Sequence, residues 1–232
     1  ENMFMINMNQ DATLDFAGTP VGYTSRPLPL VTGWNWISYL PDQTETLDQA
    51  LSGIAGSADF IKNQYGFSFY YADLGWYGFI GNMTPGDGYK IKVNTSCDLV
   101  YSVSTTQSLV ARKSPVNDGL DLTQLRSDWN LNPHDYSRSM AVTGIIADSP
   151  ELTENDIVIA YTGEEVRGVA RIREFPLTDQ QIFSLMVYGR EEDEEIGLRL
   201  YRSESESYSL GDPIRFHSDE ILGNGLDPQT FN

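Results

Sequence analysis

Aromatic side chains crowd one short stretch of this sequence, and their type and spacing suit the binding of sugars. They run from position 34 to position 89, in a segment too small to bury every ring on one side of a sheet. Exposed flat rings hold sugar rings through CH–π contact and the exclusion of water. Period-two alternation turns Tyr70 away from Phe69 and separates Trp76 from Tyr77. We therefore predict a carbohydrate-binding platform of Trp76, Tyr77 and Tyr70, the alternative being that most of these rings form core.

Catalytic motifs do not accompany these rings. The two histidines, His134 and His217, are far apart in sequence, and neither belongs to a pair with metal-ligand spacing. The HEXXH, CxxC, GxSxG, Walker and GxGxxG patterns are absent. Acidic residues are abundant, but the run EEDEE at 191–195 is expected to be a solvated hairpin tip between two strands. We therefore predict no enzymatic activity and no catalytic residues.

Calcium is the one cofactor that the sequence suggests. The segment NDGLD at 117–121 has the mixture of Asp, Asn and Gly that is typical of a calcium-binding turn. It lacks the full loop and the terminal glutamate of such a site, and these residues form Asx-type turns without a metal. We expect no cofactor and no metal ligands, with calcium in this turn as the less favoured alternative.

The charge of the chain restricts its partners. The 33 acidic and 15 basic residues give a formal net charge of −18. A negative field of this size repels nucleic acid and anionic membranes, so we exclude both as direct partners. No apolar run approaches the roughly 18 residues of a membrane-spanning helix, and we expect no membrane insertion. The single cysteine, Cys97, cannot form an internal disulfide.

One strand pair occurs twice in the sequence, at a constant offset of 85 residues. The segment MFMINMNQDATLDF at 3–16 aligns without a gap with GYKIKVNTSCDLVY at 88–101. The matched pairs are Phe4 and Tyr89, Ile6 and Ile91, Met8 and Val93, Asn9 and Asn94, Leu14 and Leu99, and Phe16 and Tyr101. We expect the first copy to be the tail of a preceding repeat, in a chain cut from a tandem array.

Residues 28–101 are predicted to form one small α+β repeat with a single helix. In GWNWISYL at 33–40, strand periodicity places Trp34 and Trp36 on one face and Ile37 and Tyr39 on the other. Apolar residues at 47, 51 and 54 predict a helix, capped by the threonine at 44 or 46. A hairpin is expected over 59–79 with its turn at 72–75, followed by a further strand from position 88.

The rest of the chain is predicted to be mainly β, so that the whole is a mainly β fold in which an α+β repeat precedes an all-β sandwich. Residues 1–27 are expected to be the trailing hairpin and a proline-rich connector, and 102–127 a linker. From 128 to 232, short strands recur about every ten residues between turn signals, which is typical of a β-sandwich. The predicted strands are Ser139–Ala147, Asp156–Thr162, Val166–Arg173, Gln180–Tyr188, Glu195–Arg202 and Pro213–His217.

Several segments resemble modules of very large exported proteins of gliding-type Gram-negative bacteria. GWNWISYL, ADFIKNQYGFSFYY and GWYGFIGNMTPGDGYKIKV resemble a repeat of such proteins. NPHDYSRSMAVTGII and FSLMVYGREEDEEIGLRLYRSES resemble the β-rich module that commonly follows it. Such modules precede sorting domains of the type IX secretion kind and stand beside glycoside hydrolases or adhesive domains. The resemblance covers most of residues 1–217 and implies an extracellular or cell-surface location within a larger chain.

Two functions fit these features best. The first is attachment, in which the chain binds a polysaccharide or another cell-surface polymer on behalf of neighbouring enzyme or adhesin domains. The second is a purely structural spacer or fibre-forming repeat without a ligand. The repeated strand pair favours this second function, since strand pairing across repeats stiffens an array. An enzyme is the third and least favoured, because its site would have to be hidden from motif analysis.

Overall fold

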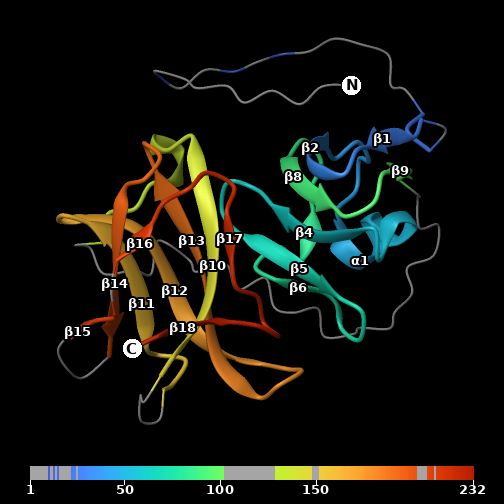
Figure 1. The fold of residues 1–232 in the computed structure, drawn as a ribbon. Coiled ribbons are helices and arrows are strands. Elements are labelled where there is room, and N and C mark those ends of the chain that lie inside the picture. Colours follow the sequence, from blue (N-terminus) through green and yellow to red (C-terminus); the bar gives the residue numbers. More distant parts are fainter. Residues whose placement is uncertain are drawn as a thin grey trace. The chain divides into compact units, whose positions relative to one another are not determined.

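The chain folds into two compact units, seen in a computed structural model (Figure 1). It describes residues 26–101, 129–147, 152–202, 208–211 and 213–232, together with 10, 13, 15 and 22–24. The N-terminal unit comprises Glu1–Asn63 and Ser68–Asn117, and the C-terminal unit comprises Gln64–Phe67 and Asp118–Asn232. Both units are built mainly from strands, which confirms the predicted mainly β fold. The predicted linker at 102–127 lies outside the described residues, as does most of the predicted hairpin and connector at 1–27.

A five-stranded sheet forms the body of the N-terminal unit, in the order β2-β8-β4-β5-β6. Strand β8 lies between β2 and β4 and pairs antiparallel with both. A side chain on β8 therefore has neighbours on two strands of the same face. The five strands are β2 (Gly33–Ser38), β4 (Ala58–Lys62), β5 (Phe67–Tyr71), β6 (Gly75–Gly78) and β8 (Gly88–Val93).

A short helix and two small strand pairs complete this unit. Helix α1 (Leu47–Ala50) begins after Thr46, whose hydroxyl accepts a hydrogen bond from the Gln49 backbone N–H, and the 3₁₀ turn η1 (Ser52–Ile54) follows it. The predicted helix is thus confirmed, although it is shorter than its apolar spacing suggested. No helix in the described part of the chain is long and apolar enough to cross a membrane. The paired strands are β1 (Leu28–Leu30) with β9 (Cys97–Leu99), and β3 (Glu45–Thr46) with β7 (Asn82–Met83).

One face of the sheet packs against α1 and η1 to form the core. Leu47 and Ile54 from these helical turns are buried in the same apolar cluster as Ile37, Ile61 and Ile91 from β2, β4 and β8. The predicted alternation along β2 is confirmed, because Ile37 faces this core while the neighbouring tryptophans face the other way. The second face of the sheet carries a different set of side chains, among which Phe60 and Lys62 are also buried.

Strands β8 and β9 are the second copy of the repeated strand pair. All five of their apolar positions that match the segment 3–16 are buried in the core: Tyr89, Ile91, Val93, Leu99 and Tyr101. The pattern that the two copies share is thus the core-facing pattern. The first copy lies almost wholly outside the described residues, and the repeat architecture stays a prediction.

A nine-stranded curled sheet makes up the C-terminal unit. Its main path is β15-β14-β11-β12-β13-β10-β17, with β16 also paired to β14 and β18 also paired to β10. The strands predicted from 139 to 217 are all present, whereas β15, β17 and β18 were not predicted. The strands are β10 (Arg138–Ile146), β11 (Ile157–Thr162), β12 (Glu165–Phe175), β13 (Gln180–Gly189), β14 (Glu195–Tyr201), β15 (Tyr208–Ser209), β16 (Ile214–Arg215), β17 (Ile221–Leu222) and β18 (Gln229–Phe231).

The two ends of this path approach each other as the sheet curls around its core. The backbone N–H of Gly211, just before β16, donates to the carbonyl oxygen of Asn232, just after β18, over 2.6 Å. The core inside the curl includes Val142, Phe183 and Leu198. Hydrogen bonds join these strands in one continuous path, so the structure supports the coarser expectation of a β-rich unit and not the finer one of a sandwich.

Candidate functional site

The sheet face opposite the N-terminal core carries aromatic and lysine side chains in register. Between β2 and β8, Trp36 lies opposite Lys90, and Trp34 lies opposite Lys92. Between β8 and β4, Lys62 lies opposite Lys90, and Phe60 lies opposite Lys92. Residues directly opposite one another point to the same side of a sheet. We call this surface the lysine–tryptophan face, and it consists of Trp34, Trp36, Phe60, Lys62, Lys90 and Lys92.

Both tryptophan rings of this face lie against a lysine ammonium group. Nζ of Lys90 is 4.5 Å from the ring centre of Trp36, and Nζ of Lys62 is 5.5 Å from the ring centre of Trp34. Both distances are within the range of cation–π attraction. Because Lys62 is on β4 and Trp34 is on β2, the Lys62 side chain extends across β8, the strand that lies between them.

The side chains of the lysine–tryptophan face are more exposed on β2 than on β4. Trp36 keeps 42% of its surface exposed, and Trp34, Lys90 and Lys92 are half-buried. Phe60 is fully buried and meets Trp34 edge-on, with 5.6 Å between ring centres. A ligand approaching this face therefore meets the Trp36 ring and the two lysines of β8 first.

A small cavity of about 290 Å³ adjoins Trp36 and is lined by residues of β1 and β2. Asn35 borders it and holds the turn before β2, because its side-chain amide donates to the carbonyl oxygens of Val31 and Gly33 over 2.7 and 3.0 Å. The volume is just below the roughly 300–1,000 Å³ of pockets that enclose a drug-sized ligand. It is therefore a small cavity beside the exposed Trp36 ring.

Trp76 belongs to the core, so its prediction as an exposed binding residue is wrong. Only 4% of its surface is exposed, and its ring meets that of Tyr70 edge-on at 5.6 Å. Its backbone N–H donates to a side-chain oxygen of Asp48 in α1, over 3.0 Å. Tyr70, which is half-buried, packs against the same core. Alternation correctly predicted that β5 and β6 each have two faces. However, Tyr70 and Trp76, which were assigned to the ligand, lie on the face that packs against helix α1.

Tyr77 is the one predicted site residue that lies on the other side of the sheet. It pairs with Phe69 across β5 and β6, and Phe69 contacts Phe60 of the lysine–tryptophan face at 4.9 Å between ring centres. Tyr77 is half-buried, and its role in carbohydrate binding stays a prediction. The prediction missed Trp36 and Lys90, although the alternating sequences GWNW and YKIKV carried the signal for them.

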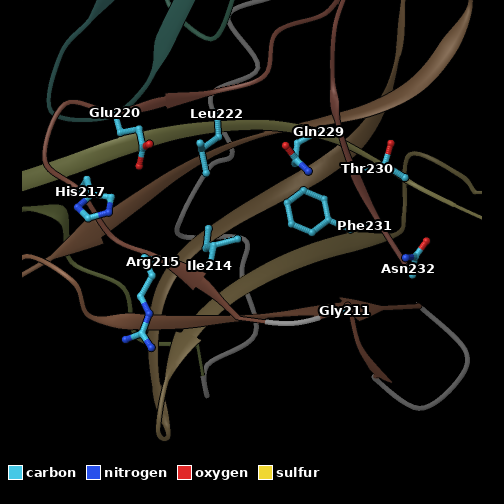
Figure 2. A pocket seen from close by; sticks show the side chains of 10 residues that line it. All are labelled: Gly211, Ile214, Arg215, His217, Glu220, Leu222, Gln229, Thr230, Phe231 and Asn232. Atoms are coloured by element: carbon cyan, nitrogen blue, oxygen red, sulfur yellow. The ribbon is translucent and has the colours of Figure 1, made fainter.

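A second cavity, of about 470 Å³, lies in the C-terminal unit where the ends of the curled sheet meet (Figure 2). Figure 2 shows Ile214, Leu222 and Phe231 in its middle, with His217, Glu220 and Arg215 to one side. Arg215 is already paired with Glu195, at 2.9 Å. His217 lies 3.7 Å from an oxygen of Asp193. None of the lining residues is a serine or a cysteine, although Thr230 carries a hydroxyl group.

An ion-pair network explains part of the acidic run at 191–195. Glu194 pairs with the buried Arg167 at 2.9 Å, so this position is not merely a solvated hairpin tip as predicted. Arg167 and Arg190 lie over the ring of Tyr136, and Arg190 holds both carboxylate oxygens of Glu165 at 2.7 Å. Hydrogen bonds from Arg190 and from the Tyr136 hydroxyl lower the pKa of Glu165 to about 2. Every charge in this network has a protein partner, which indicates a structural role.

No group of three or more potential metal ligands gathers among the described residues. The NDGLD segment at 117–121 lies outside them, and calcium binding there stays a prediction. His134 is exposed and lies in the turn η3 (Pro133–Asp135), as expected for a turn histidine.

Comparison with known proteins identifies no relative of this chain. No family model, no curated protein and no solved structure matches the chain. The resemblance to exported repeat proteins therefore stays a prediction, and the function rests on the chemistry of the lysine–tryptophan face.

Proposed function

We propose that this chain is a non-catalytic module that binds polysaccharide through the lysine–tryptophan face. The module would be part of a larger extracellular or cell-surface protein. The repeat architecture and a β-sandwich in the C-terminal unit belong to the same proposal. The observation that supports it most is the Trp36 ring, which is 42% exposed beside a Lys90 ammonium group and a small cavity.

The chemistry of this surface fits a sugar chain. A tryptophan ring offers a flat apolar surface to the C–H face of a sugar, and each ammonium group offers three hydrogen-bond donors to its oxygens. Trp34 and Trp36 are two residues apart on the same face of β2, and the Trp34 ring also meets Phe60 edge-on. Successive sugars of one polymer would follow this strand direction.

The test is affinity electrophoresis of the whole chain through gels that contain soluble plant or algal polysaccharides, with and without calcium. We expect at least one polymer to retard the unchanged protein. Trp36→Ala is expected to abolish the retardation, because it removes the most exposed ring of the face. Trp129→Ala is the matched control, since it removes a tryptophan that packs on Tyr201 in the C-terminal unit.

Two results would count against the proposal. If Trp36→Ala were retarded as strongly as the unchanged protein, the ligand would bind elsewhere. If no soluble polymer retarded the chain and insoluble cellulose and chitin failed to capture it, the binding function itself would be lost.

The alternative function is a spacer or fibre-forming repeat without a ligand. It is supported by the repeated strand pair, whose apolar matches coincide with core positions of the N-terminal unit. Polymers of the isolated chain in size-exclusion chromatography and electron microscopy would favour this alternative.

A further inference from the structure

The distribution of lysine in this chain is uneven. The sequence contains four lysines, and three of them, Lys62, Lys90 and Lys92, lie on the lysine–tryptophan face. The fourth, at position 113, lies outside the described residues. With a formal net charge of −18, most of the surface favours cations. A concentration of positive charge on one sheet face is therefore a local exception.

The register brings these positive charges together. Lys62 and Lys90 are directly opposite on neighbouring strands. Lys92 is on the same face of β8, two residues further along. Lys62 is only 4% exposed and extends over β8, so its ammonium group lies over the strand that carries the other two lysines. Three ammonium groups are therefore gathered on one face of the sheet.

Lys92 offers a charge that the described protein residues do not neutralise. Among the ion pairs of the described residues, none involves Lys92, and its side chain is half-buried beside Trp34. A lysine in this position can form a charge-assisted hydrogen bond with a ligand carboxylate or sulfate.

The first copy of the repeated strand pair has no lysine at the positions that match Lys90 and Lys92. At the offset of 85 residues, Met5 aligns with Lys90 and Asn7 aligns with Lys92. The positions that alternate with them, Tyr89, Ile91 and Val93, are apolar in both copies and buried in the second. The two copies therefore share the core-facing pattern and differ at the lysines of the second face.

We propose that the lysine–tryptophan face selects acidic polysaccharides, which carry a carboxylate or a sulfate group on their sugars. The inference rests on the proposed function and names its ligand class. A sugar on Trp36 would lie within reach of the Lys90 ammonium group, which is 4.5 Å from the ring centre. Lys92 would meet the charge of a neighbouring sugar.

The test compares polymers that differ only in charge, at an ionic strength of about 0.1 M, where repulsion from distant carboxylates is screened beyond about 10 Å. The carboxylate pair is polygalacturonate and its methyl ester, and the sulfate pair is dextran sulfate and dextran. Binding of the whole chain is measured by titration calorimetry. We expect binding to at least one charged polymer at about tenfold or greater affinity than to its neutral partner, and the preferred pair identifies the anion.

The decisive variant replaces the two lysines by the residues of the first copy, as Lys90→Met together with Lys92→Asn. We expect it to weaken binding to the charged polymer by about tenfold, which is the effect of two exposed charge contacts. Binding to the neutral polymer should weaken less, because it loses hydrogen bonds to these ammonium groups but no charge contact. Arg138→Met is the control, because it removes one positive charge from an exposed position of the C-terminal unit. A thermal unfolding curve equal to that of the unchanged protein shows that the variant is folded.

The failures of this inference and of the proposed function are distinct. Equal binding to the charged and neutral members of both pairs would overturn the selection of acidic polymers while polysaccharide binding stood. Unchanged affinity of the double variant would also overturn it. Equally tight binding of duplex DNA would do the same, because it would show attraction to any polyanion. Binding to no polysaccharide at all would defeat the proposed function itself.

Discussion

Trp76→Ala is expected to destabilise the protein more than Trp36→Ala does, whereas Trp36→Ala is the variant expected to abolish polysaccharide binding. Trp76 is 4% exposed, its ring contacts Tyr70, and its backbone N–H is tied to Asp48. Truncation of a buried tryptophan leaves a cavity and typically costs about 3–5 kcal/mol of unfolding free energy. Trp36 is 42% exposed and its removal encloses no cavity, so we expect a loss of about 1–2 kcal/mol.

A third variant, Trp76→Phe, separates packing from hydrogen bonding. The indole Nε1–H of Trp76 is buried, and no group in the described part of the chain accepts a hydrogen bond from it. A buried donor without a partner costs about 1–3 kcal/mol. Phenylalanine keeps most of the ring contacts and removes this donor. We therefore expect Trp76→Phe to stay within about 1.5 kcal/mol of the unchanged protein.

Urea denaturation followed by tryptophan fluorescence and circular dichroism measures these differences. Three of the four tryptophans, Trp34, Trp36 and Trp76, lie in the N-terminal unit, so fluorescence reports mainly on that unit. The same preparations enter the polysaccharide gels. A Trp76→Ala protein with unchanged unfolding midpoint, together with a strongly destabilised Trp36→Ala protein, would mean that the two faces of the sheet are reversed here.

Two further predictions concern the C-terminal unit. Glu165→Gln is expected to cost about 1 kcal/mol at pH 7, a value reduced for screening because the side chain is 41% exposed. The folded-state pKa of Glu165 is about 2, below its ordinary value, so this difference in stability should shrink as the pH falls from about 5 towards 2. Equal differences in urea denaturation at pH 7 and pH 3 would contradict this prediction. Gly168→Ala is expected to cost about 1–3 kcal/mol in calorimetry, because its Cβ would lie too close to the carbonyl oxygen of Met186. Gly53→Ala, whose Cβ would meet nothing within 4 Å, is its control, and an equal effect of both would refute the clash.

Local periodicity was sufficient to predict most elements of this fold. Five of the six strands predicted between positions 139 and 217 are long enough to show alternation or an apolar run. The sixth, β16, is only two residues long and lies within the predicted segment Pro213–His217. The helix at 47–54 was predicted from three apolar residues and a capping threonine, and both features are present. Strands of two or three residues, such as β17 and β18, leave no period to detect.

The assignment of a strand face to core or ligand could not be made in the same way. Period two states that Tyr70 and Phe69 point to opposite sides, but both sides of β5 carry aromatic rings, and the sequence does not say which side the helix covers. The site also depends on the register of three strands that are distant in sequence. Lys62 meets Lys90, and Trp36 meets Lys90, only because β8 pairs with β4 and β2 in one particular alignment.

The net negative charge of the chain is compatible with an acidic sugar ligand, because the two effects act over different distances. Repulsion from carboxylates elsewhere in the chain is screened within about 8 Å at physiological salt, whereas Lys90 and Trp36 would contact the ligand directly. The density of ligand charge then decides which polyanions are accepted. Duplex DNA carries one charge for about every 1.7 Å of its axis, so a DNA segment on this face would bring many phosphates close to the acidic surface around it. A polysaccharide with one charge on each sugar is less dense, and it also presents apolar C–H faces that a tryptophan ring can hold.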